Sequence, residues 1–125
     1  MEKPEFETYK RPNGHDEFLE WLQELPIKDR AKILQVITDT EEQGLLVAQR
    51  MTWVKKIDGH KNLYELRSKV AKNVQRALYF HVQNGRYVIT HGFTKKVQKT
   101  PVAEIEHAQI LKKEWWDYHE DQSNR

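Results

Sequence analysis

Residues 74–94 read VQRALYFHVQ-NG-RYVITHGFT, two β-rich runs separated by the dipeptide Asn84-Gly85. A two-residue hairpin turn of the type that suits twisted strands needs positive φ angles, which Asn and Gly adopt readily. The stretch therefore predicts an antiparallel hairpin of strands 74–83 and 86–94, with Gln83 opposite Arg86.

Continuing this register along the hairpin places Arg76 opposite Phe93, Leu78 opposite His91, and Phe80 opposite Ile89. Lys95 extends the same face beyond Phe93. The other face carries Gln75, Ala77, Tyr79, His81, Val88, Thr90 and Gly92. Neither face is wholly apolar, which predicts a sheet covered by helices on one side and partly open on the other.

Shorter strands are expected elsewhere in the chain. Two β-rich runs, Thr52–Ile57 and Asn62–Arg67, flank the turn residues Asp58-Gly59. Near the N-terminus, Phe6–Tyr9 predicts a short first strand that ends before the turn Arg11–Gly14.

Two helices are expected before the sheet and one after it. From the N-cap candidate Asp16, apolar residues recur at helical spacing up to Leu25, and Pro26 starts a second helix that ends at the C-cap candidate Gly44. Thr100 and Pro101 predict the N-cap and first residue of a last helix, whose apolar positions are Ile105, Ala108, Leu111, Trp115 and Tyr118. The fold class is α+β, with an N-terminal helical hairpin packed on a curved, mainly antiparallel sheet and a C-terminal helix. Residues 1–119 form a single domain, and the polar tail 120–125 is expected to fray.

Composition narrows the function. The chain of 125 residues contains no cysteine, which excludes disulfides and thiolate sites, and its six histidines show no metal-ligand spacing. We expect no metal and no cofactor. The charged N-terminus does not resemble a signal peptide, and no apolar run is long enough to span a membrane, so we expect a soluble cytoplasmic protein that does not bind membranes.

The charge is distributed unevenly. Residues 55–99 carry a net charge of +9, whereas residues 1–54 carry −4 and residues 100–125 carry −3, within a total of +2. Such a concentration costs self-repulsion and favours binding of a polyanion such as RNA or DNA. The alternative is a lysine-rich sheet edge that resists aggregation.

Cations gather around the hairpin: Arg67 ends one strand, Arg76 lies within the next, and Lys95-Lys96 close the last. Phosphodiester cleavage needs such groups, because guanidiniums fixed on strands stabilise the negative charge of a phosphorane. Aromatic side chains among them can stack on bases, and the candidates are Phe93, Tyr79 and Tyr87.

Several segments in this order resemble the RelE/ParE toxin superfamily, and most closely its phage-derived, HigB-like branch. They are Asn62-Leu63-Tyr64-Glu65-Leu66-Arg67, Arg76-Ala77-Leu78-Tyr79, His91-Gly92-Phe93-Thr94-Lys95-Lys96 and Lys99-Thr100-Pro101 with Glu104, Ile105 and Ala108. The resemblance covers about Glu5 to Tyr118.

The resemblance implies the toxin of a type II toxin–antitoxin module, an endoribonuclease that cleaves mRNA on the ribosome without a cofactor. The substrate's 2′-hydroxyl attacks, and the product ends in a cyclic phosphate. The cationic positions of the family fall on Arg67, Arg76, Lys95 and Lys96, with Phe93 beside them. We therefore expect the catalytic residues to be Arg67, Arg76, Lys95 and His91, and the RNA-binding residues to be Lys96, Phe93, Lys99 and Tyr79. The general base and acid stay open among His91, Lys95 and Tyr118.

The resemblance also implies partners and leaves alternatives. A cognate helix-turn-helix antitoxin would neutralise the toxin, and operator DNA would be reached only through that antitoxin. Trp21, which lies off the main apolar stripe of its helix, is either an anchor for the antitoxin or a cap on the core. The alternatives are a ParE-like inhibitor of DNA gyrase without nuclease activity, and a pure binding module.

Overall fold

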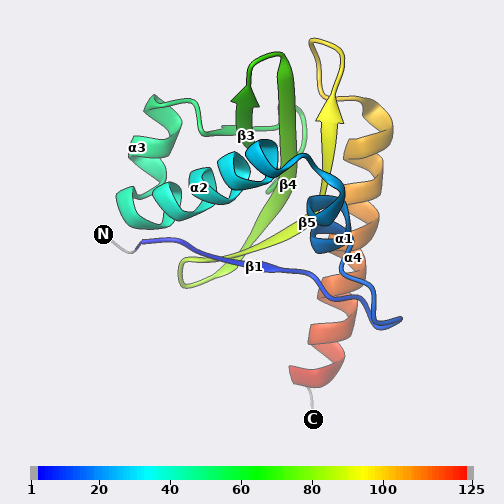
Figure 1. The fold of residues 1–125 in the computed structure, drawn as a ribbon. Helices are drawn as coiled ribbons and strands as arrows, with labels where there is room; N and C mark the ends of the chain where they lie inside the picture. Colours follow the sequence, from blue (N-terminus) through cyan, green and yellow to red (C-terminus); the bar gives the residue numbers. More distant parts are fainter. Residues whose placement is uncertain (1–2, 124–125) are drawn as a thin grey trace.

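The hairpin predicted around Asn84-Gly85 forms the centre of the structure, a computed structural model that describes residues 3–123 (Figure 1). Its strands are β4 (Asn73–Gln83) and β5 (Arg86–Lys95). The turn residues adopt φ angles of 48° at Asn84 and 78° at Gly85. Gln83 pairs with Arg86, which confirms the predicted register next to the turn.

The sheet has five strands in the order β1-β5-β4-β3-β2. The predicted runs correspond to β1 (Glu5–Thr8), β2 (Val54–Lys56) and β3 (Tyr64–Val70). Strand β1 is parallel to β5, and the other neighbours are antiparallel. The predicted α+β class and mainly antiparallel sheet are therefore confirmed.

The predicted register fails only between Leu78 and Gln83, because each strand has one extra residue there: Thr90 in β5 and Val82 in β4. Leu78 faces His91 as expected, but Tyr79 faces Ile89, so Thr90 is an extra residue in β5. The Thr90 hydroxyl donates to the Leu78 carbonyl at 3.1 Å, which satisfies a polar side chain that is fully buried at this bulge. Phe80 consequently faces Val88 rather than Ile89, and Ile89 joins the opposite face of the sheet from the predicted one.

The N-terminal helical hairpin consists of α1 (Glu17–Glu24) and α2 (Ile27–Gln43). The Asp16 carboxylate accepts a hydrogen bond from the Leu19 amide at 3.0 Å, as its predicted role of N-cap requires. Gly44, with φ of 90°, is the C-cap of α2 and also the start of α3 (Leu45–Arg50), a short helix that the sequence did not predict.

The last helix, α4, runs from Val102 to Ser123. The predicted N-cap Thr100 is wrong, because the Thr100 hydroxyl donates to Glu65 instead. The Pro101 carbonyl accepts the first helical bonds, from the amides of Glu104 and Ile105. The predicted polar tail, residues 120–125, is helical as far as Ser123, where α4 ends. Residues 124–125 lie outside the described residues.

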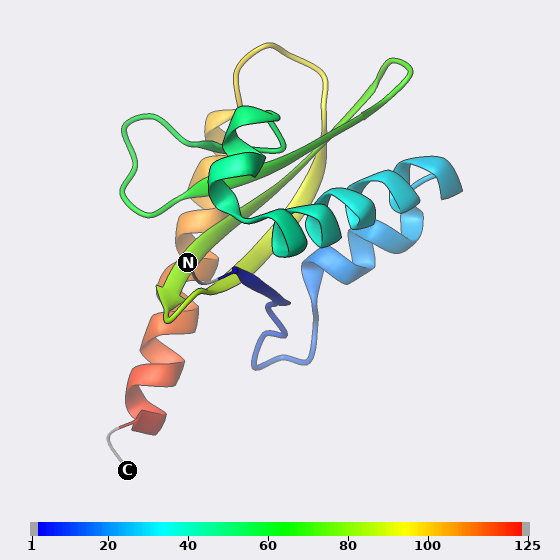
Figure 2. The same ribbon diagram turned by 90° about the vertical axis from the view of Figure 1, so that its left-hand side faces the viewer.

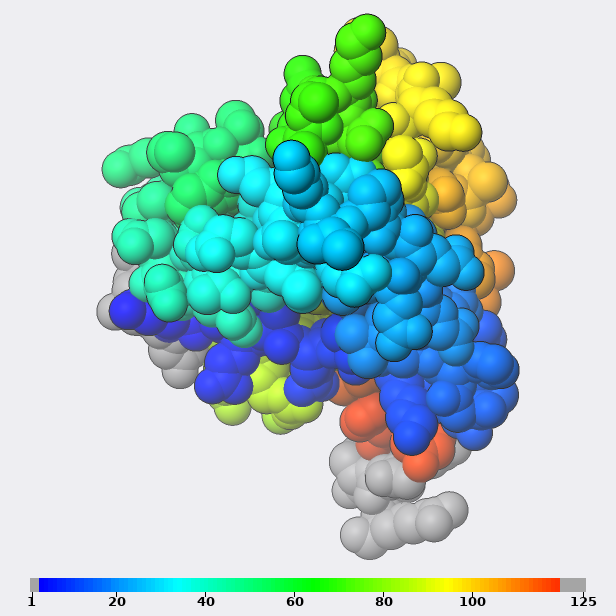
Figure 3. All heavy atoms as spheres, in the orientation of Figure 1, coloured from blue at the N-terminus to red at the C-terminus, as the bar shows by residue number. Residues whose placement is uncertain are grey.

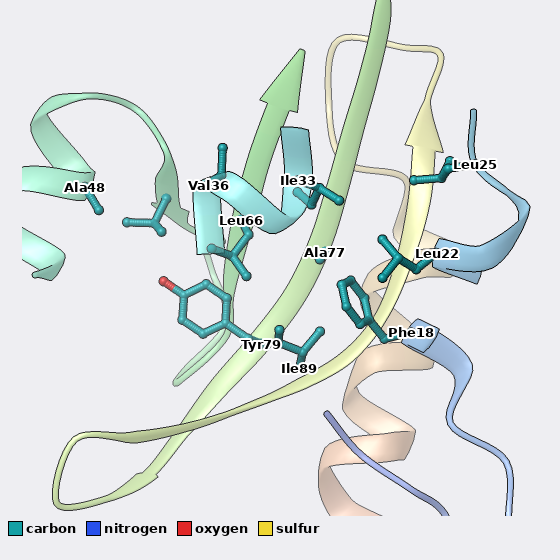
Figure 4. Packing of buried hydrophobic residues seen from close by; sticks show 11 residues of the cluster. Phe18, Leu22, Leu25, Ile33, Val36, Ala48, Leu66, Ala77, Tyr79 and Ile89 are labelled. Carbon is teal, nitrogen blue, oxygen red and sulfur yellow. The ribbon is translucent and has the colours of Figure 1, made fainter. Parts of the chain in front are cut away.

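Both faces of the sheet are covered, α1 and α2 lying on one side and α4 on the other (Figure 2). On the first side, α1 and α2 direct apolar side chains onto the strands, as Figure 4 shows for Phe18, Leu22 and Ile33 over Ala77 and Ile89. On the second side, residues of α4 cover the sheet in two clusters built around Phe80 and Val88 and around Leu78 and Phe93; the α4 residues are Ala108, Leu111 and Trp115.

The predicted open face is therefore restricted to one end of the sheet, at the C-terminal end of β5, where the strand extends past α4. Within residues 3–123, no helix combines the length and the apolar character needed to cross a bilayer.

Trp21 of α1 lies against Gly92 of β5, and a Cβ atom at Gly92 would overlap the indole ring. We expect Gly92→Ala to lower the free energy of unfolding by about 1–3 kcal/mol, because the ring must leave its position to admit the methyl group. Denaturant unfolding measures this. The cost of Gly92→Ala should shrink in a Trp21→Ala background, and an equal cost in both backgrounds would show that Trp21 does not restrict this position.

Candidate active site

Two arginines on neighbouring strands form the centre of the site. Arg67 of β3 and Arg76 of β4 are direct cross-strand partners, and Arg76 also faces Phe93 of β5. Side chains directly opposite one another share a face of the sheet, so the pair lies on the face that α4 covers further along. Lys95, two residues beyond Phe93, extends the same face.

Arg76 is the more buried of the two, with its side chain 8% exposed, against 28% for Arg67. Its Nη1 donates to the Gln75 carbonyl at 3.1 Å, whereas its Nε has no hydrogen-bond partner. Burial and then the charge of Arg67 lower the pKa of the Arg76 guanidinium. A buried guanidinium beside a second positive charge is therefore stabilised by any anion that binds next to the two arginines.

Glu65 lies beside both arginines and is the residue that sequence reasoning missed. Its Oε1 is 3.7 Å from the Nε of Arg67 and 3.7 Å from the Nε of Arg76. Its Oε2 accepts a hydrogen bond from the Thr100 hydroxyl at 2.9 Å. Strand alternation could have found it, since Glu65 and Arg67 are two residues apart on one strand and therefore share a face.

A cleft of about 850 Å³, here called the hairpin cleft, opens between the β3–β4 turn and the segment after β5. Figure 3 shows these two segments, green and yellow, projecting at one end of the molecule. No carboxylate lines the cleft among the described residues, and its cations are Arg67, Lys69, Lys72, Arg76, Lys95 and Lys96.

A second cleft of about 490 Å³, here called the loop cleft, lies between β2 and the segment 96–100. It shares Arg67, Lys95 and Gln98 with the hairpin cleft, whereas Arg76 lines the hairpin cleft alone, so the two clefts meet beside the arginine pair. Burial and then the charge of Arg76 lower the pKa of Lys95. The remaining charged residues of the loop cleft are Lys55, Lys56, Asp58, Glu65 and Lys99.

The site thus brings together five of the predicted residues: Arg67, Arg76, Lys95, Lys96 and Lys99. Residues 20–113, which include all five, match the model of a family described as phage-derived protein Gp49-like (DUF891). The chain belongs to this family. It is a toxin-like family of toxin–antitoxin modules. No curated protein is similar enough in sequence to match the chain.

In this Gp49-like chain the two aromatic residues predicted to bind RNA are buried. Phe93 is 7% exposed, and it packs in a buried cluster with Ile57, Leu63, Leu78 and Ala108. Tyr79 is 1% exposed, on the opposite face of the sheet, where its ring lies against Phe6. Neither ring is accessible to a base, so the expectation that they stack on RNA is corrected.

His91, a predicted catalytic residue, belongs to a separate network of side-chain contacts between β5 and the helices α4 and α1. It is 5% exposed, and its Nε2 is 3.1 Å from Glu104 Oε1 of α4. The ring of His107, which lies 4.8 Å from the His91 ring, is in turn 2.6 Å from Glu17 through its Nε2. Together these contacts join β5, α4 and α1, so His91 holds elements of the Gp49-like fold together and is not retained as the base.

Two other candidates are also placed. Tyr118, proposed as a general acid or base, lies near the C-terminal end of α4, whereas Ile105 near its N-terminal end lines the loop cleft. Thirteen residues of helix separate them, about 20 Å along the axis, so Tyr118 is not part of the site. Trp21 is half-buried against the core and Gly92, as expected of a cap on the core.

Among the described residues, no group of three His, Asp or Glu side chains is arranged to hold a metal ion. The clefts are lined by guanidinium and ammonium groups, with one buried carboxylate, that of Glu65, beside them.

Burial lowers the pKa of His91 below its usual 6.5, and the hydrogen bond with Glu104 only partly opposes this. A histidine whose pKa is lowered on folding binds its proton more tightly in the unfolded chain, so stability falls as the pH drops below 6.5. We expect the free energy of unfolding to fall less steeply between about pH 7 and pH 5 in His91→Gln than in the parent. Parallel profiles for the parent and His91→Gln would contradict the assignment.

Proposed function

We propose that this Gp49-like protein is the toxin of a type II toxin–antitoxin system and inhibits translation by cleaving mRNA on the ribosome. The observation that carries the proposal is the cross-strand pair Arg67–Arg76 at the junction of two cationic clefts. The family supplies the toxin class, and the resemblance to HigB-like toxins supplies the reaction.

In this reaction the 2′-oxygen of the RNA bonds to the adjacent phosphorus while the bond from phosphorus to the 5′-oxygen breaks. The products are a 2′,3′-cyclic phosphate and a free 5′-hydroxyl, which takes its proton from water. Negative charge grows on the non-bridging oxygens in between, and guanidiniums already in place stabilise it without reorganising. Arg76, fixed within a strand by burial, and Arg67 beside it suit this role.

Lys95 is the proposed general base for the 2′-hydroxyl. It lines both clefts, and its lowered pKa increases the share of neutral amine that can accept a proton. Lys96 and Lys99, both exposed, are proposed to bind flanking phosphates.

The proposed partners are the ribosome with its mRNA and a cognate helix-turn-helix antitoxin, through which operator DNA is bound. The exposed faces of α1 and α2 carry acidic residues, whereas the clefts are cationic, so one surface can bind the antitoxin while a different one binds RNA. The acidic residues are Glu17, Glu20, Glu24 and Asp39.

We expect Arg76→Ala to reduce mRNA cleavage about a hundredfold, because no guanidinium at this position then stabilises the charge of the transition state. Arg76→Lys should recover only part of this, since an ammonium cannot reproduce the planar guanidinium fork. Cleavage is measured by mapping mRNA ends after expression in a bacterium. Thermal unfolding of each variant identifies any decrease in folded protein.

Arg86→Ala is the matched control, because Arg86 lies on β5 outside the clefts and its Nη2 is 3.0 Å from Glu7 Oε1. It should cleave like the parent. Intact mRNA together with a DNA-damage response would replace the proposed function by gyrase inhibition. Full toxicity of folded Arg76→Ala would remove Arg76 from the site.

The exposed lysines of segment 96–100 should act through charge. For Lys96→Gln/Lys99→Gln, we expect the slope of log affinity for single-stranded RNA against log salt to flatten by about 0.7 for each phosphate that the variant no longer neutralises. Fluorescence anisotropy over a salt series measures it. Lys10→Gln/Lys28→Gln changes the net charge equally at exposed positions away from the clefts and should leave the slope unchanged. Equal slopes in the two double variants would place Lys96 and Lys99 off the RNA path.

A further inference from the structure

Glu65 is a buried carboxylate between two guanidinium groups. It is 2% exposed, and a single oxygen, Oε1, lies at equal distance from the Nε atoms of Arg67 and Arg76. The two arginines are direct cross-strand partners, and like charges in that arrangement repel each other. Glu65 offsets this repulsion, and so allows both arginines to stay at the cleft.

The distances show how Glu65 acts on the arginines. At 3.7 Å, neither Nε makes a hydrogen bond to Oε1. The carboxylate therefore attracts both guanidiniums without using their hydrogen-bond donors. Donors of the pair that Glu65 leaves unused and that reach the cleft are what a phosphate oxygen requires; the buried Nε of Arg76 is not among them.

The other oxygen of Glu65 reaches a different element. Oε2 accepts a hydrogen bond from the Thr100 hydroxyl at 2.9 Å. Thr100 is the last residue of the segment 96–100, which contains Lys96 and Lys99 and lies beside the clefts. One carboxylate thus contacts the two strand arginines and the end of the segment that carries the loop cations.

We propose that Glu65 is a positioning residue, which orients Arg67 and Arg76 for the scissile phosphate and, through Thr100, fixes segment 96–100 beside the clefts. The inference rests on the proposed function, because it assigns a role within the same RNA site. Glu65 touches the arginines and not the reacting atoms, so it acts through them.

Electrostatics and positioning predict opposite results for Glu65→Gln. A carboxylate that only adds negative charge to a cationic cleft weakens RNA binding, so its removal would tighten binding and leave cleavage equal or faster. A positioning residue preserves the geometry, and small displacements of catalytic groups cost large factors in rate. We expect Glu65→Gln to bind single-stranded RNA at least as tightly as the parent while kcat for mRNA cleavage on translating ribosomes falls at least about tenfold.

The Thr100 hydrogen bond is tested separately. Thr100→Val should raise KM severalfold with little change in kcat, because the loop cations are then no longer fixed in position while the arginines keep theirs. Thr100→Ser, which retains the hydroxyl, should restore the parent KM. Glu7→Gln is the matched control, since it removes a carboxylate–arginine pair between strands at the other end of the sheet.

Arginine Nε–Hε resonances give a readout that does not depend on nuclease activity. Titrating the ¹⁵N-labelled protein with inorganic phosphate should shift the Arg67 and Arg76 resonances together in the parent, and this joint response should be absent in Glu65→Gln. If the parent does not cleave mRNA but shows the joint shift, the proposed function fails and the positioning stands. Unchanged resonances and unchanged kcat in folded Glu65→Gln would overturn the inference. If that variant does not fold, an unchanged KM for Thr100→Val would overturn it.

Discussion

The pairing of β4 with β5, including the extra residue at Thr90, is the constraint on which the rest of the structure depends. In a strand, adjacent side chains point to opposite faces, so one extra residue exchanges the faces of everything beyond it. The bulge lets Ile89 join the core under α1 and α2 while Val88 packs against α4. Without it, Ile89 would lie on the α4 side and Val88 on the other side, so the bulge decides which of the two side chains packs into each helical layer.

The same hairpin divides the sheet along its length. In the middle of the hairpin, around Phe80 and Val88, both faces are covered, and Phe80 and Trp115 pack edge to face with ring centroids 5.7 Å apart. At the other end, the face beyond Phe93 is occupied by Arg76 and Lys95. The cationic groups are therefore anchored to strands whose far halves are held in a packed core, which limits their motion more than a surface loop would.

The sequence carries the strands, the turn and the helix caps Asp16 and Gly44 in local signals, and those predictions succeeded. Asn84-Gly85 needs no distant partner to favour a hairpin, and Asp16 caps its own helix. The bulge at Thr90 and the short helix α3 depend on packing from elements far away in sequence. The candidate site divides in the same way. Alternation along the strands located Arg67, Arg76 and Lys95. The burial of Phe93 and Tyr79, and the contact of His91 with α4 instead of the clefts, depend on where the helices lie.

Thr100 illustrates how a tertiary interaction overrides a local signal. A threonine followed by proline suits the start of a helix, because its hydroxyl can satisfy a free amide of the first turn. Here the hydroxyl donates to Glu65 instead. A missing N-cap costs about 0.5–2 kcal/mol, and water can replace part of it at an exposed helix start, whereas a buried group without a donor costs about 1–3 kcal/mol and a charged one more. The hydroxyl therefore goes to the group that cannot reach solvent, and the start of α4 is fixed to the strand that carries Arg67.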